Sequence, residues 1–177
     1  MLTGSLVLGA LFVTGSGLAV LRTGGYELPA GHKGTLAVFS TWQWVFAAHV
    51  ARRIAAPDRP DDLTIPTPEE VDVAGFMDGY IARMPGALRR DLLRGFAYIE
   101  HIAPLSLGYL KRFTHLSPDD QDRVLHALEV SEHPLLRGAF EGLKALVFMG
   151  YYRDARTWKI VGYEGPLIRR PQGGWTR

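Results

Sequence analysis

Beyond residue 35 the apolar positions of the chain recur with the period of an α-helix, and clusters rich in proline, glycine and aspartate separate the periodic stretches. No stretch alternates apolar and polar residues over several strands, so the pattern does not indicate a β-sheet. The predicted fold class is therefore all-α: a compact multi-helix domain with an N-terminal hydrophobic helix and an irregular, aromatic-rich C-terminal tail. The pattern predicts helices over residues 36–56, 68–84, 85–103, 105–113, 116–131 and 133–149.

Several of these helices carry local signals at their ends. Thr67 is the predicted N-cap of the second helix, with Glu69 and Glu70 in the first turn, where acidic side chains suit the helix dipole. The run 117–120, Ser-Pro-Asp-Asp, predicts another helix start, with a serine cap and a proline in the first turn. The predicted inward-facing residues of helices 68–84 and 85–103 are Val73, Phe76, Met77, Tyr80, Ile81, Met84, Leu88, Leu92, Phe96 and Ile99.

The N-terminal segment, residues 1–22, is a candidate membrane anchor or export signal. From Leu2 to Leu21 the sequence has 20 residues without a charge, and a helix of that length would span roughly 30 Å, one bilayer core. A buried N-terminal helix is the alternative. Positive charges follow the segment, beginning at Arg22, which by itself favours a cytoplasmic domain. Residues 23–35 are glycine-rich and predict a linker to the helical domain, residues 36–177.

Composition and charge exclude several classes of protein. The formal net charge is +2, from 20 basic and 18 acidic residues, and no basic helix is interleaved with aromatic residues, so we expect no nucleic-acid partner. Cysteine is absent, which excludes disulfides, c-type haem attachment, cysteine-ligated iron–sulfur clusters and a cysteine nucleophile.

Known catalytic and cofactor motifs are also missing. The six histidines form neither the Glu-x-x-His pairs of a di-iron bundle nor a His-Glu-x-x-His zinc motif; Glu100-His101 and Glu132-His133 have the wrong order. The sequence contains no dinucleotide-binding glycine loop, no Gly-x-Ser-x-Gly elbow and no phosphate-binding loop. The prediction is a chain without a metal site, without a bound cofactor and without catalytic residues of its own.

The end of the chain has the most unusual composition. The last long helix carries Gly138 and Gly142, a spacing that permits a neighbouring helix to approach closely, and a tail rich in aromatic residues follows it. This tail either completes the core of its own domain or anchors a protein partner, because Tyr, Trp and Arg are favoured at binding hot spots. The predicted partner-binding residues are Tyr151, Tyr152, Trp158, Gly162, Tyr163 and Pro166.

The tail follows the pattern Tyr-Tyr-x-Asp-x-x-Thr-Trp-x-x-x-Gly-Tyr-x-Gly-Pro over residues 151–166, directly after a long helix. This pattern resembles the C-terminal signature of the gluconate 2-dehydrogenase subunit 3 family. Two upstream stretches agree with the resemblance, Ile-Ala-Ala-Pro-Asp at 54–58 and Val-Ala-Gly-Phe-Met-Asp-Gly-Tyr at 73–80. The likeness covers the chain from about Phe39 to Pro166.

The resemblance implies an all-helical small subunit that accompanies a large, FAD-containing dehydrogenase of the glucose–methanol–choline (GMC) type. Subunits of this family are expected to assist maturation and export of the flavoprotein, and electrons can pass on to a cytochrome. FAD would then belong to the partner, and this chain would make no catalytic contribution. The resemblance favours the periplasmic face of the bacterial inner membrane, although family members commonly begin with a twin-arginine signal and no Arg-Arg pair precedes Leu2.

Two other functions stay open at this point. A membrane-tethered helical protein could bind a lipid, a quinone or another apolar ligand, and an enzyme could use a site without a known motif. The sequence favours the accessory subunit over both.

Overall fold

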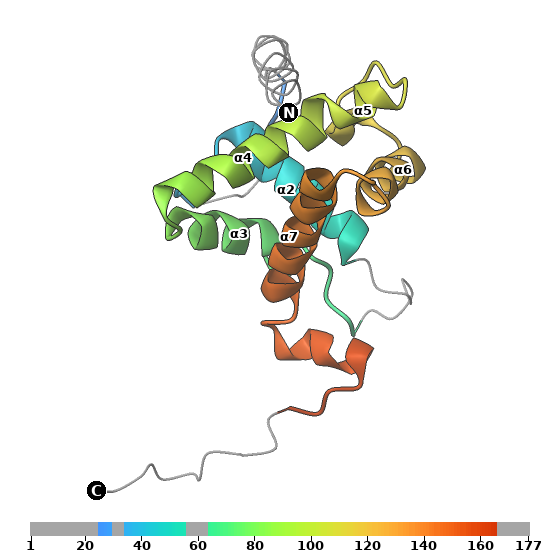
Figure 1. Ribbon diagram of the computed structural model, residues 1–177. Helices are drawn as coiled ribbons and strands as arrows, with labels where there is room; N and C mark the ends of the chain where they lie inside the picture. The colour runs from blue at the N-terminus through green and yellow to red at the C-terminus, as the bar shows by residue number, and fades with distance from the viewer. Residues whose placement is uncertain (1–24, 30–33, 56–63, 166–177) are drawn as a thin grey trace, which may run out of the picture.

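The computed structural model describes residues 25–29, 34–55 and 64–165 (Figure 1). The described residues contain no strand, so the all-α prediction is confirmed. The predicted hydrophobic segment, residues 1–22, lies outside them, and none of the described helices has the length and hydropathy of a membrane span. The α-helices are α2 (Thr41–Ile54), α3 (Val73–Ala82), α4 (Gly86–His101), α5 (Ala103–Ser106), α6 (Pro118–Glu129) and α7 (Pro134–Tyr151), and the 3-10 helices are η1 (Phe113–His115) and η2 (Ala155–Val161).

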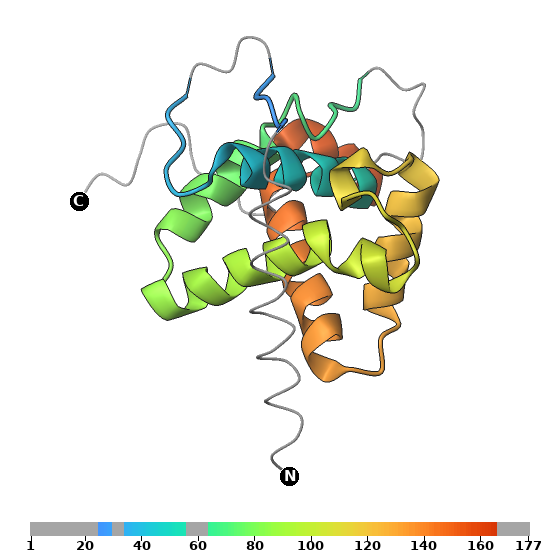
Figure 2. The same cartoon turned by 90° about the horizontal axis from the view of Figure 1, so that it is seen from above.

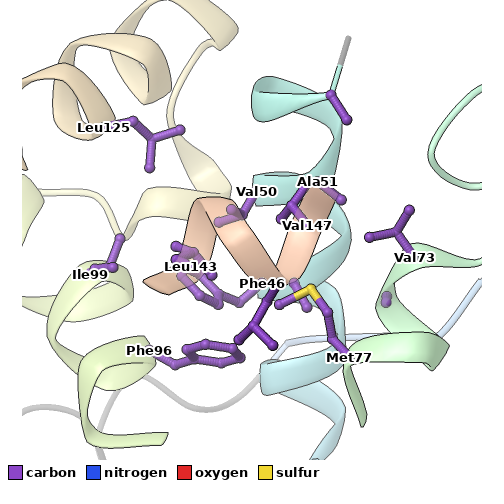
Figure 3. Packing of buried hydrophobic residues seen from close by; sticks show 14 of the residues in the cluster. Phe46, Val50, Ala51, Val73, Met77, Phe96, Ile99, Leu125, Leu143 and Val147 are labelled. Carbon is purple, nitrogen blue, oxygen red and sulfur yellow. The ribbon is translucent and has the colours of Figure 1, made fainter. Parts of the chain in front are cut away.

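Helix α2 is at the centre of the core, where it packs against α3, α4, α6, α7 and η1. Its residues Phe46 and Val50 are fully buried, and the Phe46 ring lies 5.0 Å from that of Phe96 on α4. Figure 3 shows these side chains together with Met77 from α3 and Val147 from α7. In Figure 2, α7 crosses the direction of α2 and α4, and it packs against α2, α3 and α6.

Helix α2 begins at Thr41, five residues later than the predicted start at residue 36. The reason is Asp78 on α3, whose carboxylate accepts hydrogen bonds from the main-chain N–H groups of Ala37, Val38 and Phe39 at 2.6, 2.8 and 2.8 Å. These groups are bound by a side chain distant in sequence, so residues 37–39 stay outside the helix and Ser40 becomes the N-cap.

Helix α3 also begins later than predicted. Thr67 and Glu70 do form the reciprocal hydrogen bonds of a capping box, at 2.7 and 3.2 Å, but residues 68–72 form turns and the helix starts only at Val73. Asp72 causes the interruption, because its φ of 54° is left-handed; its side chain then caps the helix by accepting the N–H of Gly75 at 3.1 Å.

The predicted helix over residues 105–113 is wrong beyond Ser106, because α5 spans only Ala103–Ser106 and residues 107–112 are not helical. The starts of α6 and α7 agree with the local signals, but two predicted surfaces are wrong. The serine at 117 and the histidine at 133 are the N-caps of α6 and α7. Leu88, predicted to face inward, is 51% exposed, and the buried residues of α4 begin only at Phe96. A Cβ added to Gly138 or Gly142 would meet nothing within 4 Å, so neither glycine marks a close helix contact.

The close helix contact is instead at Gly150, near the end of α7. A Cβ at this position would lie 2.9 Å from Phe76 Cδ1 and 3.0 Å from Val73 Cγ1, both on α3. The absence of a side chain allows α3 and α7 to approach each other here. The contact brings the end of α7, and with it the C-terminal segment, against α3.

Candidate partner-binding site

The C-terminal segment, residues 149–165, starts in the last turn of α7 with a buried tyrosine. Tyr151 is 1% exposed, and its hydroxyl donates a hydrogen bond to the Pro66 carbonyl at 2.8 Å. Tyr152, whose ring lies 5.5 Å from that of Tyr151, is only half-buried. Tyr151 therefore fixes the end of α7 to the segment before α3, whereas Tyr152 faces partly outward.

Arg153 extends this attachment to α3. Its guanidinium donates to the carbonyl of Val71 at 2.6 Å and lies 5.2 Å from the centre of the Phe76 ring. A guanidinium against an aromatic face adds a cation–π attraction to the hydrogen bond. The chain thus leaves α7 in a direction set by contacts with α3.

The turn into η2 is closed by hydrogen bonds within the segment. Asp154 is the N-cap of η2, and its carboxylate accepts the main-chain N–H of Arg156 at 2.9 Å. The hydrogen bonds from Arg156 lower the pKa of Asp154 to about 2, so this carboxylate is ionised at neutral pH. Thr157 is fully buried, and its hydroxyl is 2.8 Å from the Asp154 carbonyl and 3.2 Å from the Tyr151 carbonyl. The tail predicted to be irregular therefore contains an ordered 3-10 helix.

Trp158 and Tyr163 form the aromatic pair of the segment. The indole N–H of Trp158 donates to the Tyr152 carbonyl at 2.8 Å, and its ring lies 5.0 Å from Tyr163 in an edge-to-face arrangement. The two rings can meet because Gly162, with a φ of 65°, turns the chain back toward Trp158. After this turn the Tyr163 N–H donates a hydrogen bond to the Trp158 carbonyl at 3.0 Å.

Several apolar side chains of the segment stay exposed although its backbone is held in place. Met149 is 43% exposed, Val161 59% and Tyr163 48%. An apolar and aromatic surface on a pre-organised backbone loses little conformational entropy when it is covered by another protein. The arrangement can therefore serve as a protein-binding surface.

The predicted partner-binding residues divide into supporting and exposed positions. Tyr151 lies in the core of its own domain and supports the geometry of the segment. Tyr152 and Trp158 are half-buried, and Gly162 and Tyr163 are exposed. Pro166 lies outside the described residues. The sequence alone did not predict the exposure of Met149 and Val161, which depends on the packing of α7 and η2.

A buried acid, Glu100 on α4, was not predicted as a special residue. It is fully buried, and it accepts hydrogen bonds from the Tyr26 hydroxyl at 2.5 Å and the Thr114 hydroxyl at 2.7 Å, with Arg112 Nε at 3.9 Å. Burial raises the pKa of Glu100 to about 7, although hydrogen bonds from Tyr26 and Thr114 and the charge of Arg112 act in the opposite direction. The sequence signal that could have identified this buried acid is its position, because Glu100 directly follows Ile99, which was predicted to face inward.

Glu100 also binds a residue of the predicted linker, residues 23–35. Because Tyr26 reaches Glu100, residues 25–29 are bound to the helical domain at one point. The hydrogen bonds of residues 37–39 to Asp78 bind the following stretch at a second point. Residues 25–29, which lie within the predicted linker, are therefore attached to the helical domain through Tyr26.

The described residues contain no candidate metal site, and the pocket between α2 and α3 is too small for a large ligand. Within the described ranges, no group of three or more His, Cys, Asp or Glu side chains is placed to hold a metal ion. A pocket of about 270 Å³ lies between α2 and α3, with Trp44, Ala48 and Val73 among its mainly apolar walls. Small-molecule sites usually have volumes of roughly 300–1,000 Å³, so this pocket is at or below the lower limit.

The fold and the site define a small all-α protein with an ordered aromatic segment at the end of its last long helix, a class suited to binding another protein. The chain belongs to the gluconate 2-dehydrogenase subunit 3 family, whose model matches residues 42–165, more than two thirds of the sequence. The match includes the whole C-terminal segment and confirms the family suggested by the sequence pattern. Comparisons with curated proteins and with solved structures gave no match. Membership implies an accessory subunit of a dehydrogenase complex, with catalysis in a partner chain.

Proposed function

We propose that the chain is the non-catalytic small subunit of a membrane-associated, FAD-dependent GMC-type dehydrogenase, and that it assists assembly, stability or export of the flavoprotein. In this proposal FAD is bound by the large subunit, and a cytochrome can accept the electrons. The N-terminal segment attaches the complex to the membrane at the periplasmic face, with the cytoplasmic face as the alternative.

The observation that carries the proposal is the exposed apolar surface of the C-terminal segment, within the region that matches the family. Val161 and Tyr163 project from a backbone that is held by the Trp158 indole and by the turn at Gly162. Such a surface is typical of a binding site that forms before the partner arrives. We infer that the large flavoprotein covers it.

The alternative is a membrane-tethered protein that binds a lipid, a quinone or another apolar ligand. The pocket between α2 and α3 is the feature that favours it. A volume of about 270 Å³ is small for a lipid chain or a quinone, so this alternative has less support.

The test uses two valines with nearly equal exposure. Val161, in the C-terminal segment, is 59% exposed, and Val130, at the end of α6, is 61% exposed. The chain and its flavoprotein would be produced together in the native host, and the complex would be captured through a tag on the small subunit. Val161→Asp should reduce the recovered flavoprotein, measured by its flavin absorbance, by roughly ten-fold or more, because a charge is buried at the interface.

Val130→Asp is the control and should retain the flavoprotein. Circular dichroism would verify that both variants are folded. Equal recovery with the two variants would rule out the C-terminal segment as the binding surface. A small subunit purified without any flavoprotein, from cells that express both chains, would contradict the accessory function itself.

A further inference from the structure

Gly25 and Tyr26 are held against the helical domain by contacts with Arg112 and Glu100. Arg112 lies directly over the Tyr26 ring, with its guanidinium carbon 3.8 Å from the ring centre, and its Nη2 is 3.5 Å from the Gly25 carbonyl. Tyr26 is held from the other side by its hydrogen bond to Glu100. The position at which residues 1–24 join the domain is therefore set by Arg112 and Glu100.

The loop that leads to Arg112 has an unusual surface. This α5–η1 loop, residues 107–111, exposes Leu110 by 87% and Leu107 by 44%, and Gly108 turns the chain between them with a φ of 86°. Lys111 is also exposed, and residues 105–115 contain no acidic side chain. The loop thus combines two exposed leucines with one lysine, a pairing that matches the apolar and anionic layers of a lipid surface.

The loop is linked through Arg112 to the point at which the N-terminal hydrophobic stretch joins the domain. Leu110 is two residues from Arg112, so their Cα atoms are at most about 7 Å apart. Leu21, the last of the 20 uncharged residues, is four residues from Gly25 and at most about 14 Å from it. The contacts of Arg112 with Gly25 and Tyr26 therefore place the loop on the side of the domain at which residues 1–24 join it. If residues 2–21 enter a bilayer, this side of the domain faces the bilayer.

We infer that the α5–η1 loop is a lipid-contacting loop, in which Leu107 and Leu110 enter the bilayer interface and Lys111 contacts anionic headgroups. This inference rests on the membrane association in the proposed function. The arrangement also agrees with the proposed partner site, because α5 and η2 lie at opposite ends of the molecule (Figure 1). The subunit can therefore contact the membrane at one end and the flavoprotein at the other.

The absence of cysteine allows a direct test by site-specific spin labelling. In the full chain, Leu110→Cys and Val161→Cys place a nitroxide label at opposite ends of the molecule, at positions that are already exposed. The labelled proteins would be reconstituted into vesicles of phosphatidylcholine and phosphatidylglycerol, and sedimentation would verify incorporation. Paramagnetic resonance then measures the collision of each label with oxygen, which is enriched in lipid, and with a water-soluble nickel complex.

We expect vesicles to reduce nickel accessibility several-fold at position 110 and to leave position 161 unchanged, whereas the flavoprotein should protect position 161. If the protein sediments with vesicles but the label at 110 remains as accessible as that at 161, the loop inference is wrong and the membrane association stands. Protection of position 110 by the flavoprotein alone would identify the loop as a protein contact and would also overturn it. A chain that does not sediment would refute both the loop and the membrane association, without affecting capture of the flavoprotein.

Discussion

Removing the carboxylate of Asp78 should destabilise the domain more than any surface change of the same type. Asp78 is 5% exposed, and it holds the N–H groups of Ala37, Val38 and Phe39 at 2.6–2.8 Å. Hydrogen bonds to charged groups contribute about 1.5–3 kcal/mol each. They do not add fully here, because one carboxylate serves all three donors and the exposed Ala37 N–H can bind water after the substitution.

The N–H of Phe39 is different, because it is buried and would be left without an acceptor. From these contributions we expect Asp78→Ala to lower the free energy of unfolding by about 3–5 kcal/mol. Asp78→Asn keeps one oxygen and should cost less, about 1–2 kcal/mol. A typical domain has only 5–15 kcal/mol of total stability, so the first variant would be close to unfolding at moderate temperature.

The assay is urea-induced unfolding of the purified chain, followed by far-ultraviolet circular dichroism. Asp91→Ala is the matched control, because Asp91 forms an ion pair of 3.0 Å with Arg94 on the exposed face of α4, with side chains 68% and 61% exposed. Removal of such a pair should change stability by less than about 0.5 kcal/mol. If Asp78→Ala and Asp91→Ala unfold at the same urea concentration, the hydrogen bonds of Asp78 do not hold the start of α2 as described.

Two further predictions concern α7 and the buried acid. Gly150→Ala should lower the stability of the domain by about 1–3 kcal/mol, because the added Cβ would overlap Phe76. Gly138→Ala adds a Cβ in open space and should stabilise α7 by up to about 1 kcal/mol. Thermal unfolding of the two variants tests both expectations. Because burial raises the pKa of Glu100 from 4.5 to about 7, the folded state binds more protons between these values, and stability should fall as the pH rises from about 4.5 to 7, by on the order of 3 kcal/mol. Glu100→Gln should remove most of this slope in urea titrations at each pH, and an unchanged slope would show that another group is responsible.

The sequence by itself determined the fold class and the helices whose limits depend on neighbouring residues. The all-helical class followed from the period of the apolar positions, and the starts of α6 and α7 followed from a serine cap and from Pro134. These signals act over three or four residues, so they can be recognised without the fold. The family was also suggested by the sequence, because the aromatic pattern of residues 151–166 is contiguous.

The tertiary structure decided the features that depend on residues distant in the chain. The start of α2 depends on Asp78, which is 39 residues beyond Phe39, and the attachment of Tyr26 depends on Glu100, 74 residues away. The helix contact at Gly150, in place of Gly138, depends on how α3 and α7 cross. Periodicity shows that a residue can face inward, but burial requires a neighbouring element at that height, which Leu88 lacks and Tyr151 has. The same packing determines which aromatic residues of the C-terminal segment complete the core and which remain exposed for a partner.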